Sequence, residues 1–271
     1  MSIKVAVAGA VGRMGTRIIA NILASSDFEL VGALESASDS VLGKDAGLVA
    51  GVGESGVQIT DSLSVVMPQA DVLIDFTAPQ TTLFHLETAA KHGKAAVIGS
   101  TGHAPEEKEA IASLAKRLPF VMASNMSVGV NVLWKVVADA AKLLGSGFDV
   151  EIVEAHHRLK KDAPSGTAMT TAEVLAKALG RDLAKAAVYH REGMIGTRKS
   201  GEIGIQTIRG GDVVGDHTVF FLGNGERLEV THRATSRDTF ALGSLRAAQW
   251  IVGKPNGFYS MADVLGLNGS C

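Results

Sequence analysis

The chain has 271 residues, of which 46% are hydrophobic and 20% are charged, and its formal net charge is −2. This composition is typical of a globular protein with one large domain or two ordinary domains, and we expect two. The net charge argues against nucleic acid as a partner, because there is no excess of basic residues to follow a phosphate backbone. The first apolar run is too short to span a membrane and lacks a signal-peptide pattern, so we expect a cytoplasmic protein without a membrane partner.

Strands and helices alternate in the first part of the chain. Short apolar, β-rich runs predict strands at residues 3–8, 28–35, 71–77, 94–102 and 119–125, and helical spacing predicts helices at 13–25, 79–92 and 105–117. Such alternation forms a parallel sheet through right-handed crossovers, with ligands at the carboxyl ends of the strands. We therefore predict an α/β domain over residues 1–127.

The pattern changes after Asn125. A long amphipathic helix is predicted at 128–145, followed by strands at 148–155, 203–209, 215–222 and 226–233 with few helices between them. Glycine, asparagine and aspartate in "RGGDVVGDH" and "LGNGERL" are typical of hairpin connections. We predict a second α+β domain with a mixed sheet over 128–237, and a helical return of 238–271 to the first domain.

A glycine-rich turn follows the first predicted strand. Gly9, Gly12 and Gly15 lie between strand and helix, and Glu35 ends the second strand 20 residues after Gly15. Glycines allow a tight turn and close approach of pyrophosphate to backbone N–H groups at a helix start, while the acid accepts hydrogen bonds from ribose hydroxyls. The first domain is therefore predicted to be a Rossmann-like dinucleotide-binding domain, with Arg13 as a phosphate contact.

Two other strand ends carry small or hydrogen-bonding residues. "GSTG" (99–102) ends the fourth strand, and "ASNMSVGVN" (123–131) follows the fifth. In a parallel sheet these backbone groups are placed to hold the nicotinamide ring. The alternative is that they are ordinary strand-to-helix turns in which serine or asparagine caps a helix.

The segment "EAHHRLKKDAPSGTA" (154–168) places five potential cations in six positions, 156–161. It follows a predicted strand and leads into a helix that begins near Gly166, and such a helix start is an anion site. A histidine there suits proton transfer at neutral pH, and Lys160 is suited to pair with a carboxylate. Ser165, Gly166 and Thr167 offer N–H groups and hydroxyls to a second carboxylate. The segment is thus predicted to bind a compact dianion.

Other interpretations of the same residues exist. The run could be a solvated basic loop, and either histidine could be structural. A metal site is not expected, because adjacent histidines on a strand point to opposite faces.

Six segments occur together in one order: "VAVAGAVGRMG", "DVLIDFT", "VIGSTG", "SNMSVGVNV", "EAHHRLKKDAPSGTA" and "TIRGGDVVGDHTV". In these segments the chain closely resembles the 4-hydroxy-tetrahydrodipicolinate reductase family over nearly its whole length. The resemblance implies a homotetramer that uses NADH or NADPH to reduce a small cyclic dicarboxylate with loss of water, in lysine and diaminopimelate biosynthesis.

The resemblance also implies the roles of individual residues. His156 would be the proton donor, Lys160 its catalytic and carboxylate-binding partner, and His157, Gly166 and Thr167 would be substrate ligands. The implied cofactor contacts are Gly9, Ala10, Val11, Gly12, Arg13, Met14, Glu35, Gly99, Ser100, Thr101, Ala123, Ser124, Asn125 and Met126.

One position departs from the family pattern. Many members carry a basic residue directly after the acid of the second strand, where this chain has Ser36. A hydroxyl compensates a 2′-phosphate poorly, so we expect NADH to be used at least as well as NADPH.

Two other functions are compatible with such an architecture. A semialdehyde dehydrogenase of similar architecture needs a thiol nucleophile, and the only cysteine, Cys271, is the last residue printed. That function is therefore not expected. A regulator that binds NAD(P)H without chemistry is the rival from another class, since a fold alone does not prove catalysis.

Overall fold

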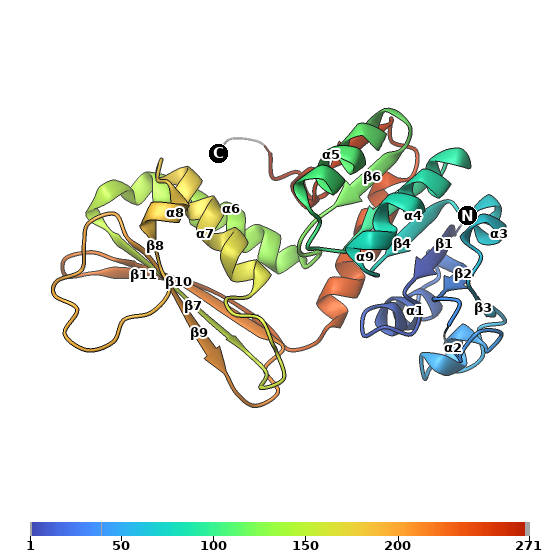
Figure 1. Cartoon of the computed structure of the whole chain (residues 1–271), viewed down its shortest axis with the longest axis horizontal. Coiled ribbons are helices and arrows are strands. Elements are labelled where there is room, and N and C mark those ends of the chain that lie inside the picture. Colours follow the sequence, from blue (N-terminus) through green and yellow to red (C-terminus); the bar gives the residue numbers. More distant parts are fainter. Residues whose placement is uncertain (1, 39, 269–271) are drawn as a thin grey trace. The chain divides into compact units, whose positions relative to one another are not determined.

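The structure is a computed structural model that describes residues 2–38 and 40–268. These residues form two compact units (Figure 1). One contains the chain up to Val128 and again from Arg237 onward, and the other contains Gly129–Ser236. Cys271, which is not expected to act as a nucleophile, lies outside the described residues. In the described part of the chain no helix is both long and apolar enough to cross a membrane.

The first unit is built on a parallel sheet. Over the described residues its strand order is β12-β6-β5-β4-β1-β2-β3, and every strand pairing is parallel. The strands are β1 (Ile3–Ala8), β2 (Phe28–Leu34), β3 (Ile59–Thr60), β4 (Val72–Asp75), β5 (Ala95–Ile98), β6 (Pro119–Met122) and β12 (Gly257–Tyr259). The predicted α/β fold with a parallel, Rossmann-like sheet is confirmed. Strands β3 and β12 were not predicted, because two or three residues are too few to show a period.

Helices cover both faces of this sheet. They are α1 (Gly15–Leu23), α2 (Ala46–Val49), α3 (Leu63–Val66), α4 (Pro79–Lys91), α5 (Pro105–Ser113), α9 (Asp238–Ile251) and α10 (Met261–Leu265), with short 3₁₀ turns η1 (Met67–Gln69) and η2 (Leu114–Lys116). One buried cluster joins the sheet to α1, α9 and α10, and a second joins it to α3, α4 and α5.

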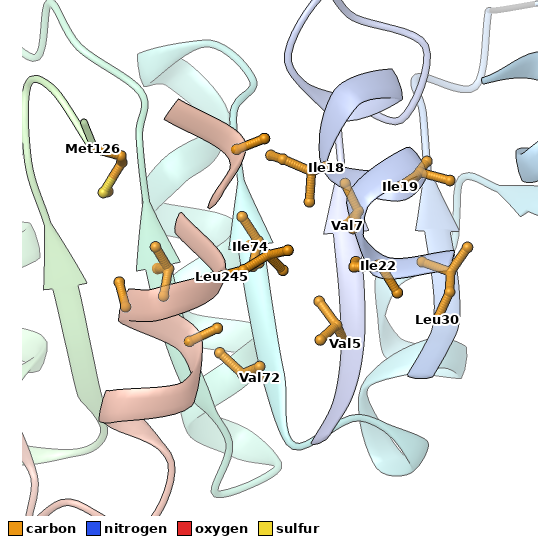
Figure 2. Packing of buried hydrophobic residues seen from close by; sticks show 14 of the residues in the cluster. Val5, Val7, Ile18, Ile19, Ile22, Leu30, Val72, Ile74, Met126 and Leu245 are labelled. Atoms are coloured by element: carbon orange, nitrogen blue, oxygen red, sulfur yellow. The ribbon is translucent and has the colours of Figure 1, made fainter. Parts of the chain in front are cut away.

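Strand β1 shows why both faces are apolar. Its side chains alternate, so that Val5 and Val7 belong to the first cluster and Ala6 and Ala8 to the second, all at most 1% exposed. Figure 2 shows the first cluster, with Val5 and Val7 beside the side chains of α1. A strand buried on both faces reads as a continuous apolar run, which is how it was recognised in the sequence.

The second unit is built on a mixed sheet. Over the described residues its order is β11-β10-β7-β9-β8; β10 is antiparallel to β7 and β11, whereas β7, β9 and β8 pair in parallel. The strands are β7 (Asp149–His156), β8 (Ala187–Val188), β9 (Ile203–Arg209), β10 (Gly215–Leu222) and β11 (Arg227–Ala234). The predicted mixed sheet is confirmed.

One of the two expected hairpins is wrong. "LGNGERL" does connect the paired strands β10 and β11, but "RGGDVVGDH" connects β9 to β10, which are not neighbours. Strand β7 lies between them and pairs with both. Glycine, asparagine and aspartate indicate that the chain turns, but they do not show whether the two strands joined by the turn are neighbours in the sheet.

Helices cover one face of the mixed sheet (Figure 1). They are α6 (Val128–Leu144), α7 (Gly166–Ala178) and α8 (Leu183–Ala186), with a 3₁₀ turn η3 (Gly145–Gly147) after α6. Val150 and Ile152 of β7 pack with Leu175 of α7 in the core of this unit. By strand alternation, Glu154 and His156 follow on the same face, where the apolar core gives way to polar groups.

Candidate active site

The glycine turn after β1 is tight enough to require its glycines. Gly9 has φ +80°, and its carbonyl oxygen accepts from the Gly12 N–H at 3.0 Å. A Cβ on Gly15 would lie 2.0 Å from that oxygen, and one on Gly12 would lie 3.2 Å from it. The first turn of α1 therefore sits directly behind the loop. This is the cradle that a dinucleotide pyrophosphate needs, so the residues present fit that group.

Glu35 lies against this turn. Its Oε2 accepts from the Val11 N–H at 3.3 Å, and its Oε1 accepts from the Ser36 N–H at 3.0 Å. The parallel pairing of β1 with β2 brings the end of β2 to the turn. The acid and the glycines, which were linked only by spacing in the sequence, are thus neighbours in the fold.

A cavity of about 570 Å³ opens beside them. Among its described lining residues there is no lysine or arginine, whereas Glu35 and Asp61 are acidic. Its wall contains Ala8, Gly9, Val11, Gly12, Leu34, Glu35, Ser36, Ala37, Asp61, Leu63, Phe76, Thr77, Ala78, Thr81, Phe84 and His85.

The remaining residues of the turn are placed differently. Arg13 is exposed, whereas Ala10 is 1% exposed in the core and Met14 packs against that core. None of these three residues is among the described residues that line the cavity. Arg17, the third residue of α1, donates two hydrogen bonds of 2.6 and 2.8 Å to Asp238.

The ends of β5 and β6 meet at a second cavity of about 340 Å³. Ser100, Thr101, Ala123 and Ser124 line it. Gly99 is needed for a different reason, because a Cβ there would lie 2.3 Å from the Phe76 ring. The structure thus groups these predicted residues, but around a cavity separate from the one at Glu35.

Asn125 and Met126 follow directly. The Asn125 side chain accepts from the Ser127 N–H at 2.8 Å, as a turn cap does. Met126 is 1% exposed, and Figure 2 shows its side chain within the first core cluster. A Cβ on Gly243 of α9 would lie 1.8 Å from the Met126 carbonyl oxygen, so this helix packs closely on the Met126 backbone.

Sequence reasoning missed a buried acid at the end of β4. Asp75 is 0% exposed and accepts from the Thr77 N–H at 2.8 Å, the Thr77 hydroxyl at 2.6 Å and His85 Nδ1 at 2.8 Å. Thr77 and His85 line the larger cavity, so Asp75 fixes part of its wall. The signal available was an aspartate at the carboxyl end of a parallel strand.

In the second unit, β7 places His156 beside a carboxylate. His156 is 9% exposed, and its Nδ1 lies 2.6 Å from Glu154 Oε2. Glu154 also accepts from Nη1 and Nη2 of Arg209, each at 2.8 Å. Neither Glu154 nor Arg209 was predicted. Arg209 is 55 residues from Glu154 in the chain, so no sequence motif links the two.

The basic run leaves the strand after His156. The His157 N–H donates to the Val213 carbonyl at 2.8 Å, and the Lys160 N–H donates to the His157 carbonyl at 3.1 Å. The Lys160 ammonium, 21% exposed, pairs with Asp162 at 2.9 Å. Over the described residues no cluster of three His, Cys, Asp or Glu side chains is arranged to hold a metal.

Ser165 lies at the start of α7. It is 2% exposed, its N–H donates to Glu154 Oε1 at 3.0 Å, and its hydroxyl accepts from the Ala168 N–H at 3.2 Å. The hydroxyl therefore caps α7 and the N–H binds Glu154, while the role of Ser165 as a substrate contact stays a prediction. Gly166 is exposed as the first residue of the helix, and Thr167 follows it.

His217 of β10 backs this helix start. Its Nε2 lies 3.2 Å from the Ser165 hydroxyl, and its ring stands edge-on to that of His156 at 5.2 Å. Burial, reinforced by the charge of His156, lowers the pKa of His217 to about 4. His217 is therefore neutral at physiological pH.

Family comparisons cover almost all of the chain. The family model described as "Dihydrodipicolinate reductase, N-terminus" matches residues 3–126, and the one described as "Dihydrodipicolinate reductase, C-terminus" matches 129–265.

Full-length relatives agree with these matches. The 4-hydroxy-tetrahydrodipicolinate reductase of Citrifermentans bemidjiense is 58% identical over 98% of this chain and 99% of the relative, and that of Geobacter sulfurreducens is 57% identical over 97% and 99%. The solved dipicolinate-bound dihydrodipicolinate reductase of Paenisporosarcina sp. TG-14 has the same fold, with a TM-score of 0.76, 24% identity and coverage of 97% and 99%. With both halves matched and relatives close over their full length, the chain belongs to the dihydrodipicolinate reductase family.

Proposed function

We propose that this chain reduces 4-hydroxy-tetrahydrodipicolinate to tetrahydrodipicolinate in lysine and diaminopimelate biosynthesis. The reaction consumes the substrate, one NAD(P)H and one proton, and yields tetrahydrodipicolinate, NAD(P)⁺ and water. The observation that carries the proposal is the buried Glu154–His156 pair beside the start of α7, in a chain of this family. That pair supplies a proton-transfer group next to an anion site, which is what reduction of a dicarboxylate requires.

The first unit is proposed to hold the nicotinamide dinucleotide. The turn from Gly9 to Met14 receives the pyrophosphate, and Glu35 accepts hydrogen bonds from a ribose in the larger cavity. The strand ends at Gly99–Thr101 and Ala123–Met126 hold the nicotinamide end through backbone groups and the Ser100, Thr101 and Ser124 hydroxyls. When bound, the reduced nicotinamide supplies the hydride.

The second unit is proposed to hold the dicarboxylate. Lys160 exchanges its contact with Asp162 for one substrate carboxylate, and Gly166 and Thr167 receive the other at the start of α7. His157 adds a further substrate contact. The substrate hydroxyl leaves as water together with a hydrogen of a neighbouring carbon. His156 then delivers a proton from Nε2 to the carbon next to the one that receives hydride, because Nδ1 is held by Glu154.

The test of this function is direct turnover. Freshly generated 4-hydroxy-tetrahydrodipicolinate is mixed with the protein and NADH, and NADH oxidation is followed by absorbance at about 340 nm, the usual nicotinamide band. Oxidation that depends on both substrate and protein is expected. Saturable NADH binding without oxidation would instead identify a nucleotide-sensing regulator.

We expect NADH to be used at least as efficiently as NADPH. A 2′-phosphate would sit beside Glu35 and Asp61 in a cavity whose described lining has no lysine or arginine. The exposed Ser36 hydroxyl lies 3.2 Å from that of Ser38, and Arg17 is committed to Asp238. A bidentate arginine would contribute about 1.5–3 kcal/mol, roughly 10- to 150-fold in affinity.

The measurement is kcat/KM for each cofactor at fixed substrate concentration and ionic strength. A Ser36→Arg variant is the matched control, and we expect it to shift the ratio toward NADPH by about tenfold or more. NADPH preferred by more than about tenfold in the wild type, a gap of about 1.4 kcal/mol, would contradict the prediction.

We also expect a homotetramer. The sheet face turned away from α7 carries apolar side chains, including Ile208 at 53% and Leu222 at 37% exposure in the single chain. A second copy of this face is the proposed cover, as the family resemblance implies. Light scattering at micromolar concentration should report a tetramer mass, and a monomer would contradict the expectation.

A further inference from the structure

Glu154 is a fully buried carboxylate on which donors from several elements converge. Its side chain is 0% exposed. Oε2 accepts from Arg209 at 2.8 Å and lies 2.6 Å from His156 Nδ1. Oε1 accepts from Arg209 at 2.8 Å, the Ser165 N–H at 3.0 Å and the Thr207 hydroxyl at 3.3 Å. These contacts use the accepting capacity of both oxygens.

This carboxylate is ionised under all physiological conditions. Burial by itself would raise the Glu154 pKa, but hydrogen bonds from His156, Arg209 and Ser165 outweigh it and lower that pKa to about 2. An ionised carboxylate only accepts hydrogen bonds. His156 Nδ1 must therefore carry a proton whether the ring is neutral or charged, and Nε2 is the one nitrogen left to exchange a proton.

The surroundings of Nε2 agree with this assignment. A Cβ on Gly215 of β10 would lie 3.0 Å from it, so the glycine keeps that side of the ring clear of a side chain. The two histidine nitrogens thus have separate tasks, with Nδ1 as an anchor and Nε2 as the exchanging atom.

The same carboxylate also holds the start of α7. Ser165, the N-cap residue, donates its N–H to Glu154, and the residues that follow it form the anion site of the proposed function. Arg209, which further donates to the Asp162 carbonyl at 2.8 Å, ties the connecting loop to the same point. The Glu154 side chain therefore contacts both His156, the proposed proton donor, and the start of α7, where a substrate carboxylate is proposed to bind.

We propose that Glu154 is a positioning residue for the reaction: it fixes His156 with Nε2 as the exchanging nitrogen and seats the start of α7, while Arg209 holds it in place. This rests on the proposed function, since it assigns how the acid and the anion site are aligned. A general acid whose other ring nitrogen is held by a neighbouring carboxylate keeps its orientation and tautomer, and loss of either lowers the rate.

The alternative is that Glu154 only stabilises the fold through its ion pair with Arg209. Strand β7 contains a second paired carboxylate, Glu151, that serves as a control for the loss of an ion pair. Glu151, three residues earlier, is 15% exposed and pairs with Arg191 at 2.8 Å and Arg198 at 3.0 Å. It projects from the opposite face of β7 and touches no residue assigned to the site. Glu151→Gln therefore breaks a comparable ion pair without disturbing His156 or Ser165.

Glu154→Gln, Glu154→Asp and Glu151→Gln are to be compared in the full-length protein. Glutamine has only one accepting oxygen, so it cannot accept from both His156 Nδ1 and the Ser165 N–H. We expect kcat of this variant to fall by roughly 10²-fold. Calorimetry with dipicolinate as a dicarboxylate probe should show binding that is at least about tenfold weaker. Aspartate keeps the charge but is too short to reach both Ser165 and His156, so kcat should fall at least about tenfold. Glu151→Gln should leave kcat within about twofold even where it lowers the melting temperature.

A spectroscopic measurement does not depend on turnover. In ¹⁵N NMR of histidine-labelled wild-type protein, the neutral His156 ring should carry its proton on Nδ1, and Glu154→Gln should move part of it to Nε2. A wild-type proton on Nε2, or a folded Glu154→Asp variant with kcat within about twofold of wild type, would overturn the proposal. If Glu154→Gln fails to fold, the aspartate variant and the wild-type spectrum decide. Absence of wild-type turnover would count against the proposed function, while the spectrum still tests Glu154.

Discussion

Replacing His156 by glutamine lowers kcat by roughly 10²–10⁴-fold, the range over which a positioned general acid contributes. Glutamine is similar in size, and its amide can still donate to Glu154, so the local packing is retained. It has no nitrogen that exchanges a proton near neutral pH. The loss should therefore appear in kcat, whereas NADH affinity stays unchanged because the proposed dinucleotide contacts lie in the other unit.

Steady-state kinetics with 4-hydroxy-tetrahydrodipicolinate and a fluorescence titration with NADH measure the two quantities. His190→Gln is the matched control, since His190 is an exposed histidine of the same unit, and its kcat should remain at the wild-type value. A His156→Gln enzyme with more than about half the wild-type kcat would rule out the general-acid role, because such a group contributes well over tenfold.

Acidification from pH 7 to pH 5 should lower the free energy of unfolding by about 2 kcal/mol through His217 alone. The pKa of this buried histidine is about 4 in the folded chain, against 6.5 as its ordinary value. The unfolded chain therefore binds a proton first as the pH falls. The stabilisation is fully present above pH 6.5, is lost progressively as the pH falls from 6.5 through 4, and changes no further below that.

Urea unfolding at pH 7 and pH 5, at fixed protein concentration, tests this. A His217→Gln variant has no titrating ring there, so its stability should fall by about 2 kcal/mol less than that of the wild type over the same interval. Glu154 does not confuse the comparison: its lowered pKa of about 2 makes its own contribution disappear only between about pH 4.5 and 2. Equal losses in the wild type and the variant would contradict the buried, neutral state of His217.

The sequence by itself determined the features whose physics is local. Val5 and Val7 continue an apolar run, and Gly9, Gly12 and Gly15 follow at the spacing of a phosphate turn, so the strand–turn–helix unit could be recognised without coordinates. The repetition of strand and helix predicted the parallel sheet for the same reason. The segment containing His156, Lys160 and Gly166 concentrates its residues within 15 positions, and the family resemblance that it carries predicted their roles.

Only the tertiary structure decided which side chains far apart in the sequence contact one another. Arg209 reaches Glu154 from 55 residues away, and His217 reaches Ser165 from 52. Both contacts exist because β7 lies between β9 and β10, an order that the turn at 209–217 does not report. Strand pairing depends on which apolar faces can be buried together, and that is a property of the whole sheet.

The state of individual side chains was likewise decided by the tertiary structure. Ser165 is predicted from the sequence only as a substrate contact, whereas in the fold its hydroxyl caps α7 through the Ala168 N–H and its own N–H binds Glu154. Met126 is a predicted cofactor contact, and the fold decides that only its backbone is available for that contact, because α9 packs over it and its side chain is buried. Which groups remain available for chemistry depends on what the folded chain has already hydrogen-bonded or buried, and sequence spacing does not carry that information.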